Sequence, residues 1–280
     1  MAVATVLLAC GCGSQASSSD RGQGGGPMDA AAGGPLAWDA AWPVWSGDAS
    51  DSLDSSRAVR VDGSYLVGPA EAGVSIAADR FVTGVVSFDP GVCAGFGAAS
   101  MPAIVEGPPA GGGSSRGSTD VVSLGTGGSI VVSFAPNAIV DGPGADFIVF
   151  ENPFWVGGNP NDIYAEPGEV SVSDDGATWH TFPCAPAIDP ASAHGTGVAP
   201  PYGACAGWHI VNSSPANGVS PIDPSVAGGD AFDLAAIGVT RARYVRIVDK
   251  TREDCPDAGG GPNTNGFDLD AVSIVNAESP

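Results

Sequence analysis

The sequence has little of what long helices are made from. Its 280 residues include one lysine (Lys250), three methionines and seven glutamates, whereas 42 are glycine and 24 are proline. Glycine and proline are the least favourable residues in a helix interior, so this composition excludes helical bundles and coiled coils. No segment reaches the roughly 20 consecutive apolar residues that a membrane-spanning helix needs.

Basic side chains are scarce as well. Ten lysines and arginines stand against 31 aspartates and glutamates, which gives a formal net charge of −21. A surface of this charge repels phosphate backbones and anionic lipids, so nucleic acid is not an expected partner. Two interpretations of the acidity stay open: it keeps the protein soluble, or it binds cations.

The first ten residues form a short apolar run, MAVATVLLAC, that ends in Leu7-Leu8-Ala9-Cys10. This run resembles the end of a bacterial lipoprotein signal, in which the cysteine is acylated. The resemblance predicts lipidation of Cys10, a lipid anchor as the membrane contact, and a surface-exposed or periplasm-facing place in the cell envelope, with secretion as the alternative. No Lys or Arg precedes the run. We therefore expect either a truncated start or an ordinary apolar N-terminus with a spare cysteine.

The composition changes twice before the main domain. Residues 11–35 are rich in Gly, Ser and Ala and cannot bury enough surface to order themselves, so we expect a flexible, disordered tether. Residues 36–78 carry Trp38, Trp42 and Trp45 in a small, acidic stretch. We expect this extension to pack on a main domain of residues 79–277, an exposed aromatic platform being the alternative.

Six cysteines are present, four of them beyond Cys10 and Cys12. An even number in an exported chain indicates two disulfides, and among the three possible pairings we choose Cys184–Cys205 and Cys93–Cys255. A zinc site is the alternative, but the sequence has neither a CxxC pair nor a close pair of histidines.

From about residue 79 onward, short β-prone runs alternate with turn clusters and no helical pattern intervenes. This predicts an all-β fold, an antiparallel sandwich or barrel. A loop as long as 184–229 is expected to be functional or held by a disulfide. The strands are predicted near residues 80–88, 121–124, 129–134, 146–151, 169–173, 178–182, 244–249 and 270–275, with one helical turn near 231–237.

Two segments make the architecture more specific. Residues 170–182 (VSVSDDGATWHTF) predict a hairpin that turns at Asp175-Gly176. Residues 242–248 (ARYVRIV) predict a strand with Val245 and Ile247 inward. In this order the two segments resemble the discoidin (coagulation-factor type C) domains of the galactose-binding-like group. The resemblance implies a discoidin-like jelly-roll sandwich and, by analogy, a carbohydrate, lipid or protein ligand.

A wider set of phrases resembles a family of uncharacterised bacterial cell-surface proteins. The resemblance covers about residues 79–277 and implies a surface location and a β-sandwich, but no reaction. The phrases are VVSLGTGGS (121–129), IVDGPGADFIVFEN (139–152), GGDAFDL (228–234), YVRIVD (244–249) and GFDLDAV (266–272).

Several acids lie where a core is expected. Strand alternation places Asp268 and Asp270 on the face of Val272, and Glu151 ends an apolar strand. A buried carboxylate must meet a metal or hydrogen-bond donors, because an uncompensated charge costs several kcal/mol. Jelly-roll carbohydrate modules commonly hold a structural calcium near the last strand, so the resemblance implies Ca²⁺ here. The alternative is that the acids cap backbone N–H groups in turns. The candidate ligands are Asp270, Asp268, Glu151, Asp141 and Asp146.

Aromatic and amide side chains in the predicted loops suit a sugar ligand, because rings stack on sugar faces while amides and carboxylates bond hydroxyls. The alternative is that these rings pin their loops to the domain. The candidates are Trp155, Tyr164, Tyr202, Trp208, Asn159 and Asp162.

Catalytic motifs are poorly supported. Gly113-Ser-Ser115-Arg-Gly117 matches GxSxG without the strand, turn and helix of a nucleophile elbow. His180, His194 and His209 show no metal-ligand spacing. We therefore predict a non-catalytic surface binding or adhesion module for a glycan or a surface protein. The alternatives are an envelope polysaccharide hydrolase or lyase that uses loop acids, and a purely structural surface protein.

Overall fold

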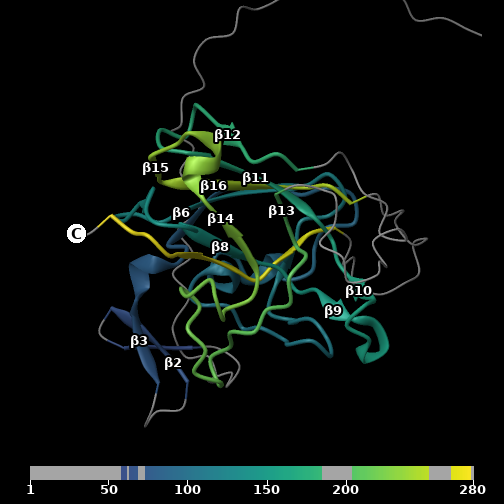
Figure 1. Cartoon of the computed structure of the whole chain (residues 1–280). Helices are drawn as coiled ribbons and strands as arrows, with labels where there is room; N and C mark the ends of the chain where they lie inside the picture. The colour runs from purple at the N-terminus through teal and green to yellow at the C-terminus, as the bar shows by residue number, and fades with distance from the viewer. Residues whose placement is uncertain (1–57, 62, 69–72, 185–203, 252–265, 279–280) are drawn as a thin grey trace, which may run out of the picture. The chain divides into compact units, whose positions relative to one another are not determined.

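The computed structural model describes residues 58–61, 63–68, 73–184, 204–251 and 266–278 (Figure 1). These residues form short strands and single 3₁₀ turns, as the lack of helix formers predicts. In this part of the chain no helix has the length and apolar character to cross a membrane. The predicted lipobox cysteine Cys10, the linker and the tryptophans Trp38, Trp42 and Trp45 lie outside the described residues.

The larger sheet has six strands and is antiparallel at every pairing, with β13 joining it at the start of β11. In Figure 1 it occupies the upper part of the domain. Its strands are, in order, β12 (His180–Thr181), β11 (Gly168–Ser173), β16 (Tyr244–Asp249), β6 (Ser129–Ser133) and β4 (Gly84–Asp89), with β13 (Cys205–Ala206) beside β11.

The opposing sheet has three strands, with β8 (Phe147–Phe150) between β14 (Asp230–Phe232) and β18 (Ala271–Ile274). Two further antiparallel pairs extend the sandwich. They are β7 (Ile139–Val140) with β15 (Arg241–Ala242), and β5 (Val122–Ser123) with β17 (Asp268–Leu269).

Alternating side chains explain why these segments form a sandwich. In β16 Val245 and Ile247 are fully buried, whereas Tyr244 and Arg246 are half-buried on the outer face. Both faces of β8 are buried: Phe147 and Val149 enter the large core between the sheets, and Ile148 packs in a second cluster. Phe147 also stacks on Phe232 of β14, with ring centroids 5.1 Å apart. The predicted all-β sandwich is confirmed.

The described residues between 58 and 77 form a small sheet that precedes the sandwich. It consists of β1 (Val59–Val61), β2 (Ser64–Val67) and β3 (Val74–Ala77), followed by the 3₁₀ turn η1 (Ala78–Arg80). Val67 and Ile76 pack with Phe81, at the start of the main domain. This sheet is the described part of the predicted extension 36–78.

The remaining elements are short, and they show where the predicted boundaries move. The strand expected near 80–88 begins only at Gly84, because Ala78–Arg80 form η1. The helical turn expected near 231–237 is η5 (Leu234–Ile237), which follows the unpredicted strand β14. The others are η2 (Ala98–Ser100), η3 (Ala103–Val105), β9 (Phe154–Trp155), η4 (Val156–Gly158) and β10 (Ile163–Tyr164).

Candidate functional site: a buried carboxylate cluster

Three buried carboxylates meet at one edge of the sandwich. One oxygen from each of Glu151, Glu166 and Asp268 lies within 4.8 Å of the others. The three residues are only 2%, 2% and 7% exposed. We call this group the carboxylate triad.

The strand ends bring the triad together. Glu151 directly follows β8, Glu166 lies two residues before β11, and Asp268 begins β17. The backbone N–H of Asp268 donates to Oε1 of Glu151 at 3.4 Å, which ties two of the three residues to each other. Two of the three acids, Glu151 and Asp268, are predicted ligands, whereas Glu166 is not.

The charge on Glu151 lacks full compensation by hydrogen bonds. Oε2 of Glu151 is buried and has no hydrogen-bond partner among the described residues. Burial raises the pKa of Glu151 well above its usual range, and the nearby charges of Asp268 and Asp230 raise it further. Asp268, by contrast, accepts hydrogen bonds from the Ser123 hydroxyl and, at 3.2 Å, from Asn152 Nδ2.

Such a cluster can be stabilised in two ways. A proton can neutralise Glu151, or a cation can bind between the carboxylates. Carboxylate oxygens are the ligands that Ca²⁺ prefers, and the triad has neither thiolate nor imidazole to select a softer metal. The residues therefore fit a calcium ion.

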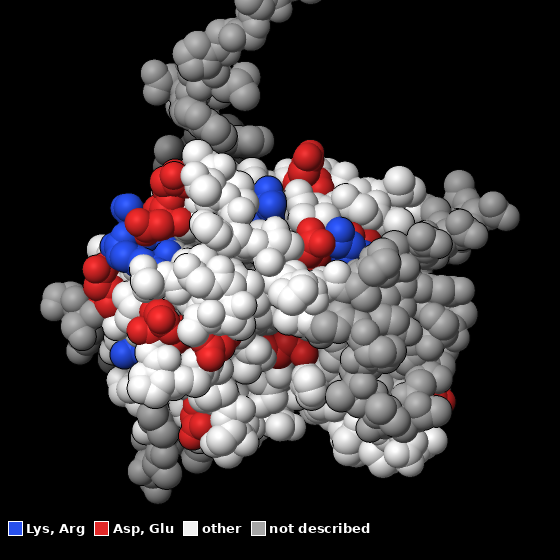
Figure 2. Space-filling model, turned by 45° about the horizontal axis from the view of Figure 1, so that its top comes forward, with Lys and Arg blue, Asp and Glu red and all other residues white. Residues whose placement is uncertain are grey.

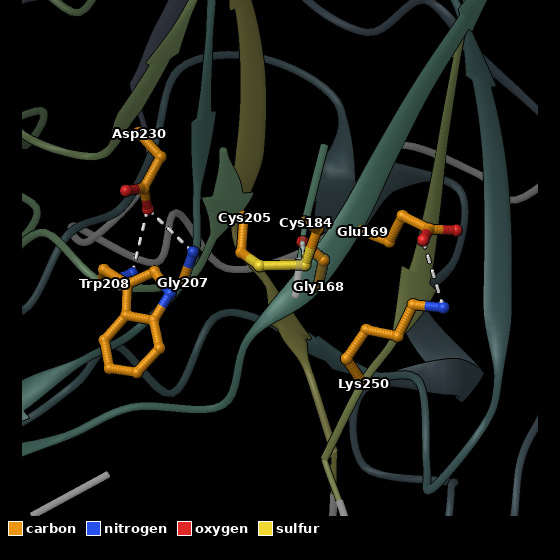
Figure 3. Close-up of a disulfide and its surroundings, with 8 residues drawn as sticks. All are labelled: Gly168, Glu169, Cys184, Cys205, Gly207, Trp208, Asp230 and Lys250. Carbon is orange, nitrogen blue, oxygen red and sulfur yellow. Dashed lines mark hydrogen bonds and ion pairs between the residues drawn. A yellow bond between two sulfur atoms is a disulfide. The ribbon is translucent and has the colours of Figure 1, made fainter. Parts of the chain in front are cut away.

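Asp230 links the triad to the surface. Its Oδ2 accepts the backbone N–H groups of Gly207 and Trp208, at 2.7 and 2.9 Å (Figure 3). Its Oδ1 lies 2.6 Å from Nδ1 of His209, whose side chain is 67% exposed. This hydrogen bond raises the pKa of His209. Asp230 is not among the predicted ligands.

The predicted Cys184–Cys205 disulfide is confirmed, with Cα atoms 4.7 Å apart (Figure 3). Cys93 is also disulfide-bonded. Its predicted partner, Cys255, lies outside the described residues, so the Cys93–Cys255 pairing stays a prediction. The confirmed bridge holds β13 near β11 and packs with Ala165 and Trp208.

Asp270 lies apart from the triad. Its two carboxylate oxygens accept the backbone N–H groups of Ala110 and Gly111, both at 2.9 Å. The predicted alternation also breaks here. Leu269 and Val272 are three residues apart, yet both enter the large core, because Asp270 interrupts the strand between β17 and β18. Asp268 and Asp270 therefore do not both share the face of Val272. Asp270 thus caps a loop, as the alternative interpretation of these acids expects.

Asp141 and Asp146 form a second acidic cluster with Asp233, which was not predicted. Asp146 is fully buried, but each of its oxygens has a donor at 2.8 Å: Gly142 N–H and Asn276 Nδ2 for Oδ1, and Leu234 N–H for Oδ2. Asp233 caps η5 by accepting from Ala235 N–H. Asp146 and Asp233 thus organise turns through hydrogen bonds. The five predicted metal ligands fall into three separate places.

The predicted aromatic ligands also separate. Trp155 and Tyr164 lie half-buried on the β9–β10 hairpin, where the Tyr164 ring stacks on Phe154 with centroids 5.2 Å apart. Asn159 is exposed at the hairpin turn and Asp162 is half-buried there. Trp208 is only 8% exposed and packs against the disulfide, so it offers no open ring face. Tyr202 lies outside the described residues.

Two cavities lie between the small sheet and the sandwich, away from the triad. The smaller, of about 150 Å³, is lined by Glu106, Asp120 and Asp270 together with Tyr65. The larger, of about 460 Å³, has a mixed lining, in which the polar side chains are those of Arg60, Tyr65, Asp79, Thr83 and Glu106.

Neither the family models nor the curated proteins compared with this chain gave a match. The resemblance to discoidin domains therefore remains an expectation beyond its β-sandwich. The function has to be argued from the geometry of the triad and its surroundings.

Proposed function

We propose that the chain is a non-catalytic binding module whose β-sandwich is stabilised by a Ca²⁺ ion held between Glu151, Glu166 and Asp268. The observation that carries this proposal is the burial of three carboxylates around Glu151 Oε2, an oxygen that has no hydrogen-bond donor in the described part of the chain. A divalent cation would compensate charges whose burial otherwise costs several kcal/mol.

The same residues favour a binding role over catalysis. All three carboxylates are almost fully buried, so a polysaccharide chain has no open path to them. Their position instead suits an ion that holds strand ends and the segments between them. Loops carried by a rigid sandwich are the usual place for ligand contacts.

The ligand surface in this proposal is the β9–β10 hairpin, which lies between Glu151 and Glu166 in the chain. It carries the half-buried rings of Trp155 and Tyr164 and the exposed amide of Asn159. Rings beside amides suit a sugar, so a glycan is the first ligand to test. We place the module at the bacterial envelope, tethered by a lipid on Cys10, as the sequence of the first ten residues suggests.

Thermal unfolding of metal-stripped full-length protein tests the calcium site. Calcium at a hundred times its dissociation constant adds about 2.7 kcal/mol of stability, or roughly 5–10 °C for a domain of this size. Glu151→Gln should melt higher than wild type in chelator, because a charge repulsion is gone, yet gain nothing from calcium. Asp141→Asn, in the other cluster, should keep the full gain. Identical wild-type melting in chelator and in calcium overturns the calcium site.

A glycan array in calcium, read with wild type and Trp155→Ala, tests the binding role. Binding that the substitution weakens supports the hairpin as the ligand surface. Absence of binding to every glycan removes the glycan ligand, and turnover of a polysaccharide that a single carboxylate substitution abolishes replaces the binding module with an enzyme.

A further inference from the structure

The outer face of the six-stranded sheet carries a row of side chains without a carboxylate. Strand pairing places Arg246 of β16 beside Ser171 of β11 on one side and Val131 of β6 on the other. Thr181 of β12 and Ser87 of β4 continue the row at its two ends. The chain has 31 acidic residues, so a row that contains an arginine and three hydroxyl side chains but no acid differs from the acidic character of the rest.

The Arg246 guanidinium is held in place, and no ion pair with a described residue neutralises it. Its central carbon lies 4.5 Å from the centroid of the Trp179 ring, and Nη2 donates to Ser171 Oγ at 3.4 Å. Its Nε is buried and finds no acceptor among the described residues. A guanidinium fixed by a ring in this way presents its N–H groups with little further loss of entropy.

Neighbouring basic residues differ from Arg246 in having acidic partners. Arg243 pairs with Asp174 at 3.0 Å, and Lys250 pairs with Glu169 at 3.2 Å. Among the described residues Arg246 makes no such ion pair. Figure 2 shows Lys and Arg side chains beside Asp or Glu side chains in two places on one face of the molecule, whereas other Lys and Arg side chains on this face have no acid beside them in the view.

The acids closest to this row make no ion pair with Arg246 among the described residues. Asp89 of β4 lies in the adjacent row, beside Ser129, and is two strands away from Arg246. Glu169, in the adjacent row, is engaged by Lys250. Asp174, in the hairpin turn before Trp179, is engaged by Arg241 and Arg243, which lower its pKa and keep it charged. Within the described part of the chain, no carboxylate neutralises Arg246, so its charge can meet a negative group supplied from outside.

We propose that this face binds the carboxylate of an acidic sugar residue, such as a uronate in a polysaccharide. The planar carboxylate matches the two Nη groups of the Arg246 guanidinium, while the Trp179 ring and the Thr181 and Ser87 hydroxyls suit the sugar ring and its hydroxyls. This inference rests on the proposed binding function and names the sugar class that a second surface, distinct from the β9–β10 hairpin, would select.

Calorimetry with trigalacturonic acid and with its trimethyl ester tests the inference on the full-length protein. The two probes differ in charge but hardly in shape, so we expect the acid to bind about tenfold tighter or more. Arg246→Gln should remove this preference, and Arg246→Lys should keep only part of it, because lysine retains the charge without the fork. Arg243→Gln, a control at an arginine that is ion-paired with Asp174, should bind like wild type.

Thermal unfolding of each variant is also measured, so that a loss of binding is interpreted only for variants that fold. Equal binding of the acid and the ester, no binding of either, or an unchanged preference in folded Arg246→Gln overturns the inference. The calcium gain in melting is a separate readout. If it persists while the acid preference is absent, the inference fails and the proposed calcium-stabilised module stands.

Discussion

The carboxylates of Glu151 and Glu166 lie together at the base of the segment that connects them. One oxygen of each lies within 4.8 Å of the other and of Asp268, although residues 152–165 separate the two glutamates. That segment contains the whole β9–β10 hairpin and its aromatic side chains. An ion in the triad would therefore fasten the base of the hairpin, whereas mutual repulsion of the carboxylates would loosen it.

Hydrogen exchange should reveal this fastening. We expect peptides within residues 152–165 to exchange about tenfold more slowly in calcium than in chelator, because local opening of the hairpin would then require release of the ion. Peptides from the turn at Asp175 and Gly176, which hydrogen bonds within the turn already hold, serve as the control. If calcium slowed exchange equally in both regions, the ion would have no specific effect on the hairpin.

Asp270 should matter for stability but not for calcium. Asp270→Ala removes the acceptor of the Ala110 and Gly111 N–H groups, so it should lower the free energy of unfolding by about 3 kcal/mol. Asp141→Ala, at an exposed position, should change it by no more than about 0.5 kcal/mol. Denaturant unfolding measures both, with and without calcium. If folded Asp270→Ala loses its response to calcium, Asp270 is a ligand after all.

The His209–Asp230 pair predicts a stability that depends on pH. The hydrogen bond to Asp230 raises the pKa of His209 in the folded state above the unfolded value of about 6.5. The stabilisation is therefore complete below about pH 6.5 and is lost as the pH rises through the raised folded pKa. An NMR titration of the His209 ring should show the raised pKa, and Asp230→Asn should return it toward the ordinary value. A His209 pKa that Asp230→Asn leaves unchanged would contradict this assignment.

The disulfide should stabilise by a predictable amount. Cys184 and Cys205 are 21 residues apart, and closing a loop of that length stabilises by about 3 kcal/mol in the chain-entropy model. The double variant Cys184→Ala/Cys205→Ala should lose this amount in denaturant unfolding. A loss below about 1 kcal/mol would mean that the loop is already restrained in the unfolded chain.

The strands that could be predicted are those with a simple burial pattern. β16 and β6 alternate because each has one face on the core, and β8 is a short apolar run bounded by turns. β9, β10, β13, β15 and β17 each have two residues, which is too short for any period to show. Their existence depends on pairing partners far along the chain.

The triad was only half visible in the sequence for a similar reason. Glu151 and Asp268 stand beside apolar residues and were predicted to be buried, whereas Glu166 lies between Ala165 and Pro167, outside any recognisable strand. The alternation of side chains along a strand predicts which face of the sheet a residue lies on, but not which residue it contacts there. Asp268 and Asp270, two residues apart, consequently meet different partners, the triad and the loop at Ala110.

The most direct measurement is the anomalous scattering of calcium in crystals grown with calcium chloride. If the triad holds calcium, a peak is expected between Glu151, Glu166 and Asp268, at about 2.3–2.6 Å from their carboxylate oxygens. No peak there, with the three carboxyl groups hydrogen-bonded directly to one another, or a peak only beside Asp141, Asp146 and Asp233, would contradict the proposed site.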